Sequence, residues 1–148
     1  MSEPPPAVAR VRRVLPAPPE RVFAEWVDPA AITVWMCPRP ARCLRAELEP
    51  WAGGKLRFDI EDSGVEFTVE GEFTVVDRPS RLSFTWRCST WADPSADSLV
   101  VVSLDPHQDR QTLMTIEHFL LPDGLEAQHR DGWAAIAEQL AGVLSDQA

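Results

Sequence analysis

Histidine and cysteine are the side chains in this 148-residue chain best suited to acid–base or metal chemistry, with three of each. His118 follows Met114 and Ile116 at two-residue steps, which in a strand places all three side chains on one inward face. His129 lies on the apolar stripe of a C-terminal helix, near its start. Each ring is either a core histidine hydrogen-bonded to a neighbour, which the pattern favours, or a polar anchor in a ligand pocket. The sequence offers no third metal ligand beside them, so we predict no metal site.

The other reactive residues do not indicate a catalytic site. Cys37, Cys43 and Cys88 have no metal-binding spacing, and their odd number predicts free thiols with a structural role. Motifs of serine hydrolases, phosphate-binding loops, zinc proteases and dinucleotide-binding folds are missing from the sequence, so no cofactor is expected. Paired carboxylates occur only on the predicted wet faces of strands, where they favour solubility: Asp59 with Glu61, and Glu70 with Glu72.

Aromatic residues supply most of the predicted pocket. They are core residues by default, but the same rings could line an apolar cavity. Gly132 interrupts the apolar stripe of the C-terminal helix, where glycine costs about 1 kcal/mol relative to alanine. Either the helix packs closely on the sheet there, or space is left for a ligand. The predicted ligand-binding set is Trp35, Phe58, Phe73, Trp86, Trp91, His118, His129, Gly132, Trp133 and Ile136.

The element that must position these residues is a long amphipathic helix over 123–145. Its apolar side chains recur at three- and four-residue steps and therefore share one face. Asp123 is the predicted N-cap, with Glu126 as its capping-box partner. A rod of this length, about 33 Å, can cross a small domain and needs a surface to lie on.

The chain before this helix predicts that surface. A strand over 8–15 precedes two short helices, 20–27 and 28–35, for which Pro19 and the pair Asp28-Pro29 are start signals. Six strands with period-two alternation follow from Cys43 to His118, joined by turns and by a polar loop over 89–97. Their expected inward residues include Leu44, Ala46 and Leu48 in the first of the six, and Gly71, Phe73 and Val75 in the third. The predicted fold class is α+β: a helix-grip fold in which a curved antiparallel sheet of about seven strands surrounds a long C-terminal helix.

Composition limits the function further. The formal net charge of −9 disfavours a nucleic-acid partner, because phosphate binding needs a basic face. No apolar stretch is long enough to span a membrane and no leader peptide is recognisable, so we expect a cytoplasmic, bacterial protein. Residues 1–9 are predicted to be a disordered tail, and residues 10–148 a single domain.

The order of these motifs resembles the START-like, or Bet v 1-like (SRPBCC), helix-grip superfamily. In particular it resembles the branch named after the C-terminal domain of the heat-shock-protein-90 ATPase activator. The matching segments are Pro18–Phe23 with Trp26, Asp28-Pro29, Trp35, Gly53–Phe58, Gly71–Phe73, Asp77–Pro79, Arg81–Trp86, Thr112–His118, His129 and Gly132-Trp133. The resemblance implies a cavity between sheet and long helix. Met36, where the family often has a second Trp, and the 89–97 loop depart from the pattern near the expected cavity mouth.

Three functional classes are compatible with this fold. The favoured class is a protein that binds a small hydrophobic or amphipathic molecule, because the sequence supplies aromatic walls and few convergent polar groups. The second is an enzyme, such as a cyclase or hydrolase of a hydrophobic metabolite, working in the same cavity. The third is a chaperone-cofactor-like interaction module, disfavoured because the activator's separate N-terminal domain has no counterpart here. The sequence leaves a homodimer open.

Overall fold

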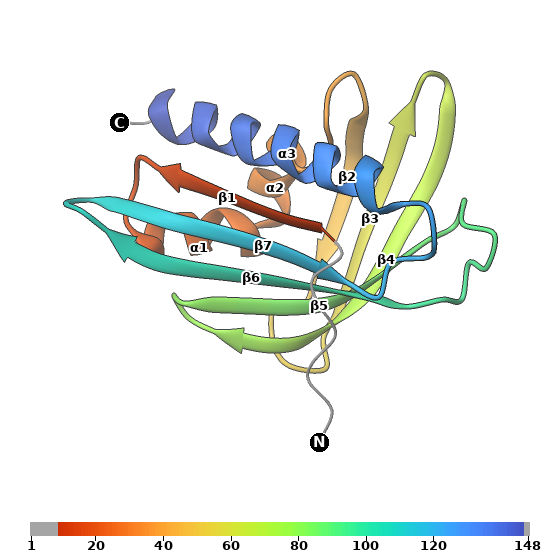
Figure 1. Cartoon of the computed structure of the whole chain (residues 1–148), viewed down its shortest axis with the longest axis horizontal. Helices are drawn as coiled ribbons and strands as arrows, with labels where there is room; N and C mark the ends of the chain where they lie inside the picture. The colour runs from red at the N-terminus through yellow and green to blue at the C-terminus, as the bar shows by residue number, and fades with distance from the viewer. Residues whose placement is uncertain (1–8, 147–148) are drawn as a thin grey trace.

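A curled seven-stranded sheet closes around a long helix, as predicted (Figure 1). The computed structural model describes residues 9–146. Its elements, in chain order, are β1 (Ala9–Leu15), α1 (Pro19–Val27), α2 (Pro29–Trp35), β2 (Arg42–Leu48), β3 (Lys55–Asp62), β4 (Val65–Asp77), β5 (Arg81–Cys88), β6 (Ser98–His107), β7 (Gln111–Phe119) and α3 (Glu126–Asp146). The predicted disordered tail lies outside the described residues except for Ala9, which is the first residue of β1 and is buried.

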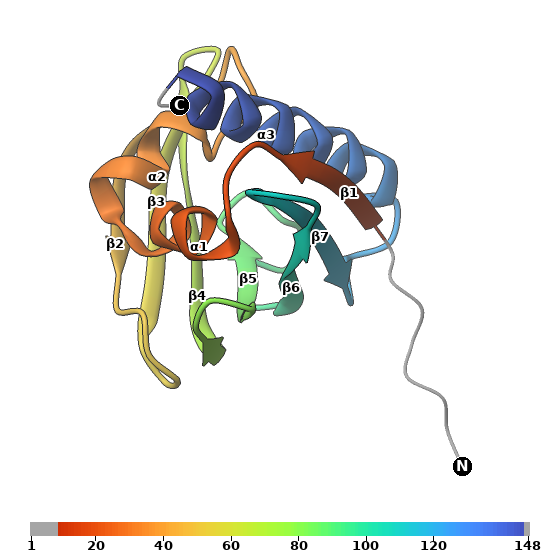
Figure 2. The same ribbon diagram turned by 90° about the vertical axis from the view of Figure 1, so that its left-hand side faces the viewer.

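All neighbouring strands are antiparallel, in the order β1-β7-β6-β5-β4-β3-β2. The sheet bends into a half-barrel, and α3 lies across its open side while α1 and α2 fill the end of the concave face (Figure 2). The fold class is therefore α+β with a helix-grip arrangement. Within residues 9–146, no helix combines the length and apolarity needed to cross a membrane.

The two short helices begin as the sequence predicts. Pro19 occupies the first turn of α1, where its missing N–H leaves no bond unmade. The Asp28 carboxylate caps α2 by accepting hydrogen bonds from the backbone N–H groups of Ala30 (2.9 Å) and Ala31 (3.3 Å).

The predicted start of the long helix is wrong. Instead of capping a helix, Asp123 lies in an exposed turn that the Leu125 N–H closes by donating to the Pro122 carbonyl (3.3 Å). Gly124 has a φ of +87° in this turn, a left-handed conformation that glycine adopts without steric cost. The helix begins only at Glu126, so Glu126 is in its first turn and cannot complete a capping box with Asp123.

Two β-bulges correct the predicted inward faces. The pairing of β2 with β3 shifts register between Cys43 and Arg45, and Leu44, predicted to face inward, is 46% exposed. The pairing of β4 with β5 shifts between Phe73 and Val75, so Val75 is 37% exposed and Val76 packs against the core instead. An extra residue in one strand exchanges the two faces beyond it, which explains both errors.

A polar clamp fixes the chain between α2 and β2 against α3. The Gln139 amide donates to the carbonyls of Trp35 (3.0 Å) and Cys37 (2.8 Å), and its oxygen accepts the Arg39 N–H (3.0 Å). Helical periodicity places Gln139 on the side of α3 that meets this irregular segment. The clamp holds residues 36–41 beside the helix, where they help to enclose the space described next.

Candidate functional site

A cavity of about 690 Å³ lies between the sheet and the first half of α3. Its floor is formed by the ends of β3, β4 and β5, through Ile60, Phe67, Val69, Trp86 and Cys88. Met36, Cys37, Pro38 and Ala41 close one side, and α3 contributes Gln128, His129, Gly132, Trp133 and Ile136. Two loops form the mouth: one carries Thr90 to Ala96, the other Leu120 to Leu125. The walls are mostly apolar, and the volume is that of an ordinary small-molecule site.

Six of the ten residues predicted to bind a ligand line this cavity. They come from β5, the 89–97 loop and α3: Trp86, Trp91, His129, Gly132, Trp133 and Ile136. The other four do not line it. Trp35, Phe58, Phe73 and His118 are at most 2% exposed and belong to the layer behind the wall.

The tryptophan rings form a connected wall. Trp86 and Trp133 have ring centroids 5.3 Å apart, and Phe58 supports Trp86 from behind at 6.0 Å. Trp91 approaches His129 edge-on at 6.0 Å and is only partly buried at the mouth. The predicted position of the 89–97 loop and of Met36 beside the cavity is confirmed, since both contribute to its lining.

Gly132 faces open space rather than packed backbone. A methyl group added at its Cα would have one neighbour within 4 Å, the Pro38 Cγ atom at 3.9 Å, which is an ordinary van der Waals distance. Of the two explanations that the sequence left open, close helix–sheet packing is therefore wrong. The glycine leaves room in the wall.

His118 is a core histidine whose ring nitrogens are both used by the protein. The Trp133 indole N–H donates to His118 Nδ1 (3.0 Å), so in the neutral ring the proton is on Nε2. That N–H donates to Ser98 Oγ (2.7 Å), and the Ser98 hydroxyl donates to the Trp86 carbonyl (2.6 Å). Burial, together with the nearby His129, lowers the pKa of His118 to about 3. The ring stays neutral near pH 7, and it fixes Trp133 against β5 and β6.

His129 is different because it has a ring nitrogen to offer. Its Nδ1–H donates to the Leu125 carbonyl (3.0 Å), which makes Nε2 the acceptor of the neutral ring. Among the described residues no protein group bonds to Nε2, and Nε2 is not among the atoms sealed from solvent. Burial lowers the pKa of His129, partly offset by the bond to Leu125. The cavity therefore has a neutral imidazole acceptor in its wall.

The cysteines are free thiols, as predicted. Cys37 and Cys88 line the cavity, while Cys43 is on β2, where its thiol donates to the Arg45 carbonyl (3.6 Å). The interaction between the Cys37 and Cys43 thiols, together with burial, raises the pKa of Cys37, and the same interaction lowers the pKa of Cys43. Across residues 9–146, no three His, Cys, Asp or Glu side chains are grouped to hold a metal ion.

Sequence reasoning missed the carboxylates at the mouth. Asp93 and Asp123 lie in loops and turns, where periodicity does not indicate a direction, and Asp62 is the last residue of β3. All three are exposed residues that help to line the cavity. Between α2 and β2, sequence reasoning placed Met36 beside the cavity but missed three wall residues: Cys37, Pro38 and Ala41. The sequence held one indication of these wall residues: an irregular segment between a helix and an edge strand must cover the end of the sheet.

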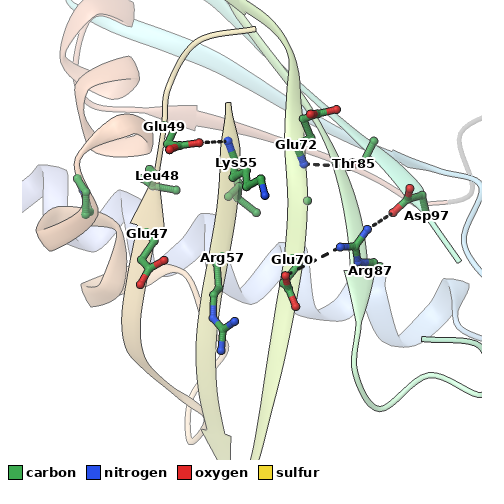
Figure 3. A pocket seen from close by; sticks show the side chains of 13 residues that line it. Glu47, Leu48, Glu49, Lys55, Arg57, Glu70, Glu72, Thr85, Arg87 and Asp97 are labelled. Atoms are coloured by element: carbon green, nitrogen blue, oxygen red, sulfur yellow. Dashed lines mark hydrogen bonds and ion pairs between the residues drawn. The ribbon is translucent and has the colours of Figure 1, made fainter. Parts of the chain in front are cut away.

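A second hollow of about 680 Å³ lies on the sheet face turned away from α3 (Figure 3). Most of its lining residues are charged, and the charged ones come from β2 to β5 and from the ends of the adjoining loops. Arg87 lies between Glu70 (3.9 Å) and Asp97 (3.7 Å), and Glu49 accepts the Lys55 backbone N–H (2.8 Å). Exposed pairs of this kind bind weakly in water. We take this hollow as the solvated outer face of the sheet and the cavity under α3 as the candidate site.

A half-barrel sheet around a long helix, with an apolar cavity between them, defines a helix-grip protein of the START-like class. The sequence profile described as "Activator of Hsp90 ATPase homolog 1-like protein" matches residues 16–145, and the chain belongs to that family. A comparison with curated proteins finds no significant match.

Solved structures support the same assignment. Protein CV1439 from Chromobacterium violaceum is similar with 26% identity and a TM-score of 0.81, over 91% of this chain and 94% of that one. The AHSA1 (SPO3351) protein from Silicibacter pomeroyi shares the fold with 24% identity and a TM-score of 0.82, over 94% and 98% of the two chains. CalU16 from Micromonospora echinospora shares it with 20% identity and a TM-score of 0.68, over 93% and 76%.

Proposed function

We propose that this protein binds a small hydrophobic or amphipathic molecule in the cavity under α3. The observation that carries the proposal is the cavity itself: about 690 Å³ of space, open at one end, with Trp86 and Trp133 in its wall. Exposed apolar walls are costly in water, and a bound ligand would cover them at about 25 cal/mol per Å². The proposed contact residues are Trp86, Trp91, His129, Gly132, Trp133 and Ile136.

Binding has more support than catalysis. His118 is committed to bonds within the protein, and its low pKa keeps it neutral. That leaves His129 as the imidazole in contact with the cavity. A single accessible imidazole can orient a ligand, whereas general acid–base catalysis commonly needs groups in complementary protonation states.

Two glycines on α3 provide a matched test. Gly132 borders the cavity, whereas a side chain at Gly142 would meet nothing within 4 Å. We expect N-phenyl-1-naphthylamine, a neutral fluorescent probe, to bind the wild type saturably at one site. Gly132→Leu should fill part of the cavity and weaken binding at least tenfold, and Gly142→Leu should leave it unchanged.

Thermal melts of both variants would establish that each is folded. No saturable binding to the wild type, or equal weakening by both substitutions, would refute the proposed site. Native mass spectrometry of the protein purified from its own host would then give the mass of any ligand that it retains.

A further inference from the structure

The charged side chains that line the cavity are all of one sign. The lining contains three carboxylates, Asp62, Asp93 and Asp123, and no lysine or arginine. None of these carboxylates forms an ion pair with a residue in the 9–146 range. The basic side chains of β3 and β5 point to the opposite face of the sheet, where Arg57 pairs with Asp59 and Arg87 with Glu70 and Asp97. The mouth is therefore a one-sided electrostatic environment, in a protein whose formal charge is already −9.

The neutral polar atoms of the cavity add to this bias. His129 Nε2 is a hydrogen-bond acceptor without a protein partner, as argued above. The indole N–H of Trp133, a donor that could have received an anion, is already bonded to His118. A ligand carboxylate would thus meet carboxylates at the mouth and an acceptor inside. The side-chain donors left to it in the lining, such as the Thr90 hydroxyl and the Gln128 amide, are neutral, and no lysine or arginine in the 9–146 range lines the cavity to replace its water.

The walls favour the opposite charge. The faces of tryptophan rings attract cations, and Trp91 stands at the mouth close to the carboxylate-bearing loops. The Ser95 hydroxyl and backbone N–H donate to Asp93 Oδ1 at 2.6 Å and 3.1 Å, and these bonds lower the pKa of Asp93. Asp93 thus remains an anion throughout the neutral range.

We propose that the ligand is a hydrophobic amine: an apolar, ring-containing body that occupies the space between Trp86 and Trp133, with a protonated nitrogen directed at the mouth carboxylates. This inference rests on the proposed binding function and specifies its ligand class. The ammonium group would lie near Asp62, Asp93 or Asp123, and would donate to His129 Nε2 if it sits deeper.

Three compounds with one ring system test the sign of the charge: 1-naphthylmethylamine (an ammonium at pH 7), 1-naphthylmethanol (neutral) and 1-naphthaleneacetate (a carboxylate). Their affinities would be measured at pH 7 by displacement of N-phenyl-1-naphthylamine and by calorimetry. One exposed ion pair usually changes a binding constant about two- to fivefold. Partial interactions with several carboxylates therefore predict that the amine binds about tenfold tighter than the carboxylate, with the alcohol between them. The preference should shrink in 0.5 M salt, because exposed charges are screened.

A matched pair of triple variants locates the effect. Asp62→Asn/Asp93→Asn/Asp123→Asn removes the mouth charges, whereas Asp77→Asn/Asp105→Asn/Asp109→Asn removes three exposed carboxylates that do not line the cavity. The first variant should reduce the preference for the amine to threefold or less, and the second should retain it.

The two proposals fail in different ways. If 1-naphthaleneacetate binds as tightly as the amine, if both triple variants behave alike, or if none of the three compounds binds although N-phenyl-1-naphthylamine does, the amine proposal is overturned while the cavity stays a binding site. If N-phenyl-1-naphthylamine does not bind either, the binding function itself is refuted, and the ligand class with it.

Discussion

Replacing Gly132 with alanine should stabilise the protein. In a helix interior alanine is favoured over glycine by about 0.8–1 kcal/mol. The new methyl group would have Pro38 Cγ at 3.9 Å as its nearest neighbour outside the helix backbone, so no steric cost opposes this gain. The expected change is an increase of up to about 1 kcal/mol in the free energy of unfolding, or about 2–4 °C in the melting temperature for a domain of this size.

Gly142→Ala is the control, because it makes the same chemical change on the same helix away from the cavity. It should stabilise by a similar or slightly smaller amount, since Gly142 lies near the end of α3, where helices fray. Only Gly132→Ala should also weaken binding of a ligand that fills the cavity.

Urea unfolding followed by tryptophan fluorescence measures both variants, with midpoints compared at unchanged slope. If Gly132→Ala lowered the midpoint while Gly142→Ala raised it, the methyl would be overpacking a filled core, at a cost of about 1–3 kcal/mol. The space beside α3 would then be too small for the proposed role.

Three other predictions test individual contacts. The pKa of His118 is about 3 in the folded protein, below the ordinary 6.5, so on acidification the unfolded state takes up this proton first. The free energy of unfolding should therefore fall by up to about 1.4 kcal/mol per pH unit between roughly pH 6.5 and 3. Urea titrations that show no such fall would contradict the buried network. Iodoacetamide should modify Cys43 before Cys37, because the interaction of the two thiols lowers the pKa of Cys43 and raises that of Cys37, and Cys37 is the more buried of the two. Peptide mass spectrometry over time would show the order, and the reverse order would contradict the prediction. Asp28→Ala should cost about 0.5–2 kcal/mol by removing the cap of α2, whereas an unchanged urea midpoint would mean that the cap contributes nothing.

The fold could be predicted from the sequence because its signals are periodic and local. The alternation in Leu56, Phe58 and Ile60 fixes the buried face of β3, and all three residues are buried. Asp28, Pro19 and Pro29 mark helix starts, because a capping carboxylate and a proline in the first turn act on the backbone within one turn. Such rules need no knowledge of distant residues.

The bulges could not be predicted in the same way. One extra residue near Leu44 and another near Val75 invert the alternation, yet each local sequence still reads as a regular strand. Their positions depend on how the sheet must bend around α3, which is a property of the whole domain. The turn over Pro122–Leu125 misled for a related reason: Asp123 and Glu126 have capping-box spacing, but Gly124 between them takes a left-handed conformation.

Periodicity also predicts which face of the sheet a side chain lies on, but not how deep in the core it is buried. Phe58, Phe73 and Trp86 all point inward from neighbouring strands, and only Trp86 reaches the cavity surface. The curl of the sheet brings the end of β5 under α3, whereas Phe73 lies against Phe84 in the packed part of the core. Which inward residues touch a ligand site therefore depends on curvature that the sequence does not display.

The use of His118 connects the packing to the proposed recognition. A buried histidine without partners would be costly, but here its two nitrogens join Trp133 of α3 to Ser98 of β6 across the core. The network fixes the Trp133 ring as a preformed wall, and a preformed wall lowers the entropy lost when a ligand binds. It also occupies both nitrogens of His118, so that His129 is the histidine left in the cavity lining. Discrimination by charge then depends on three exposed carboxylates outside the packed core: Asp93 and Asp123 in loops and turns, and Asp62 at the end of β3. Ligand shape and ligand charge are thus read by different parts of the chain, which is why the cavity-filling and charge-neutralising variants should separate the two.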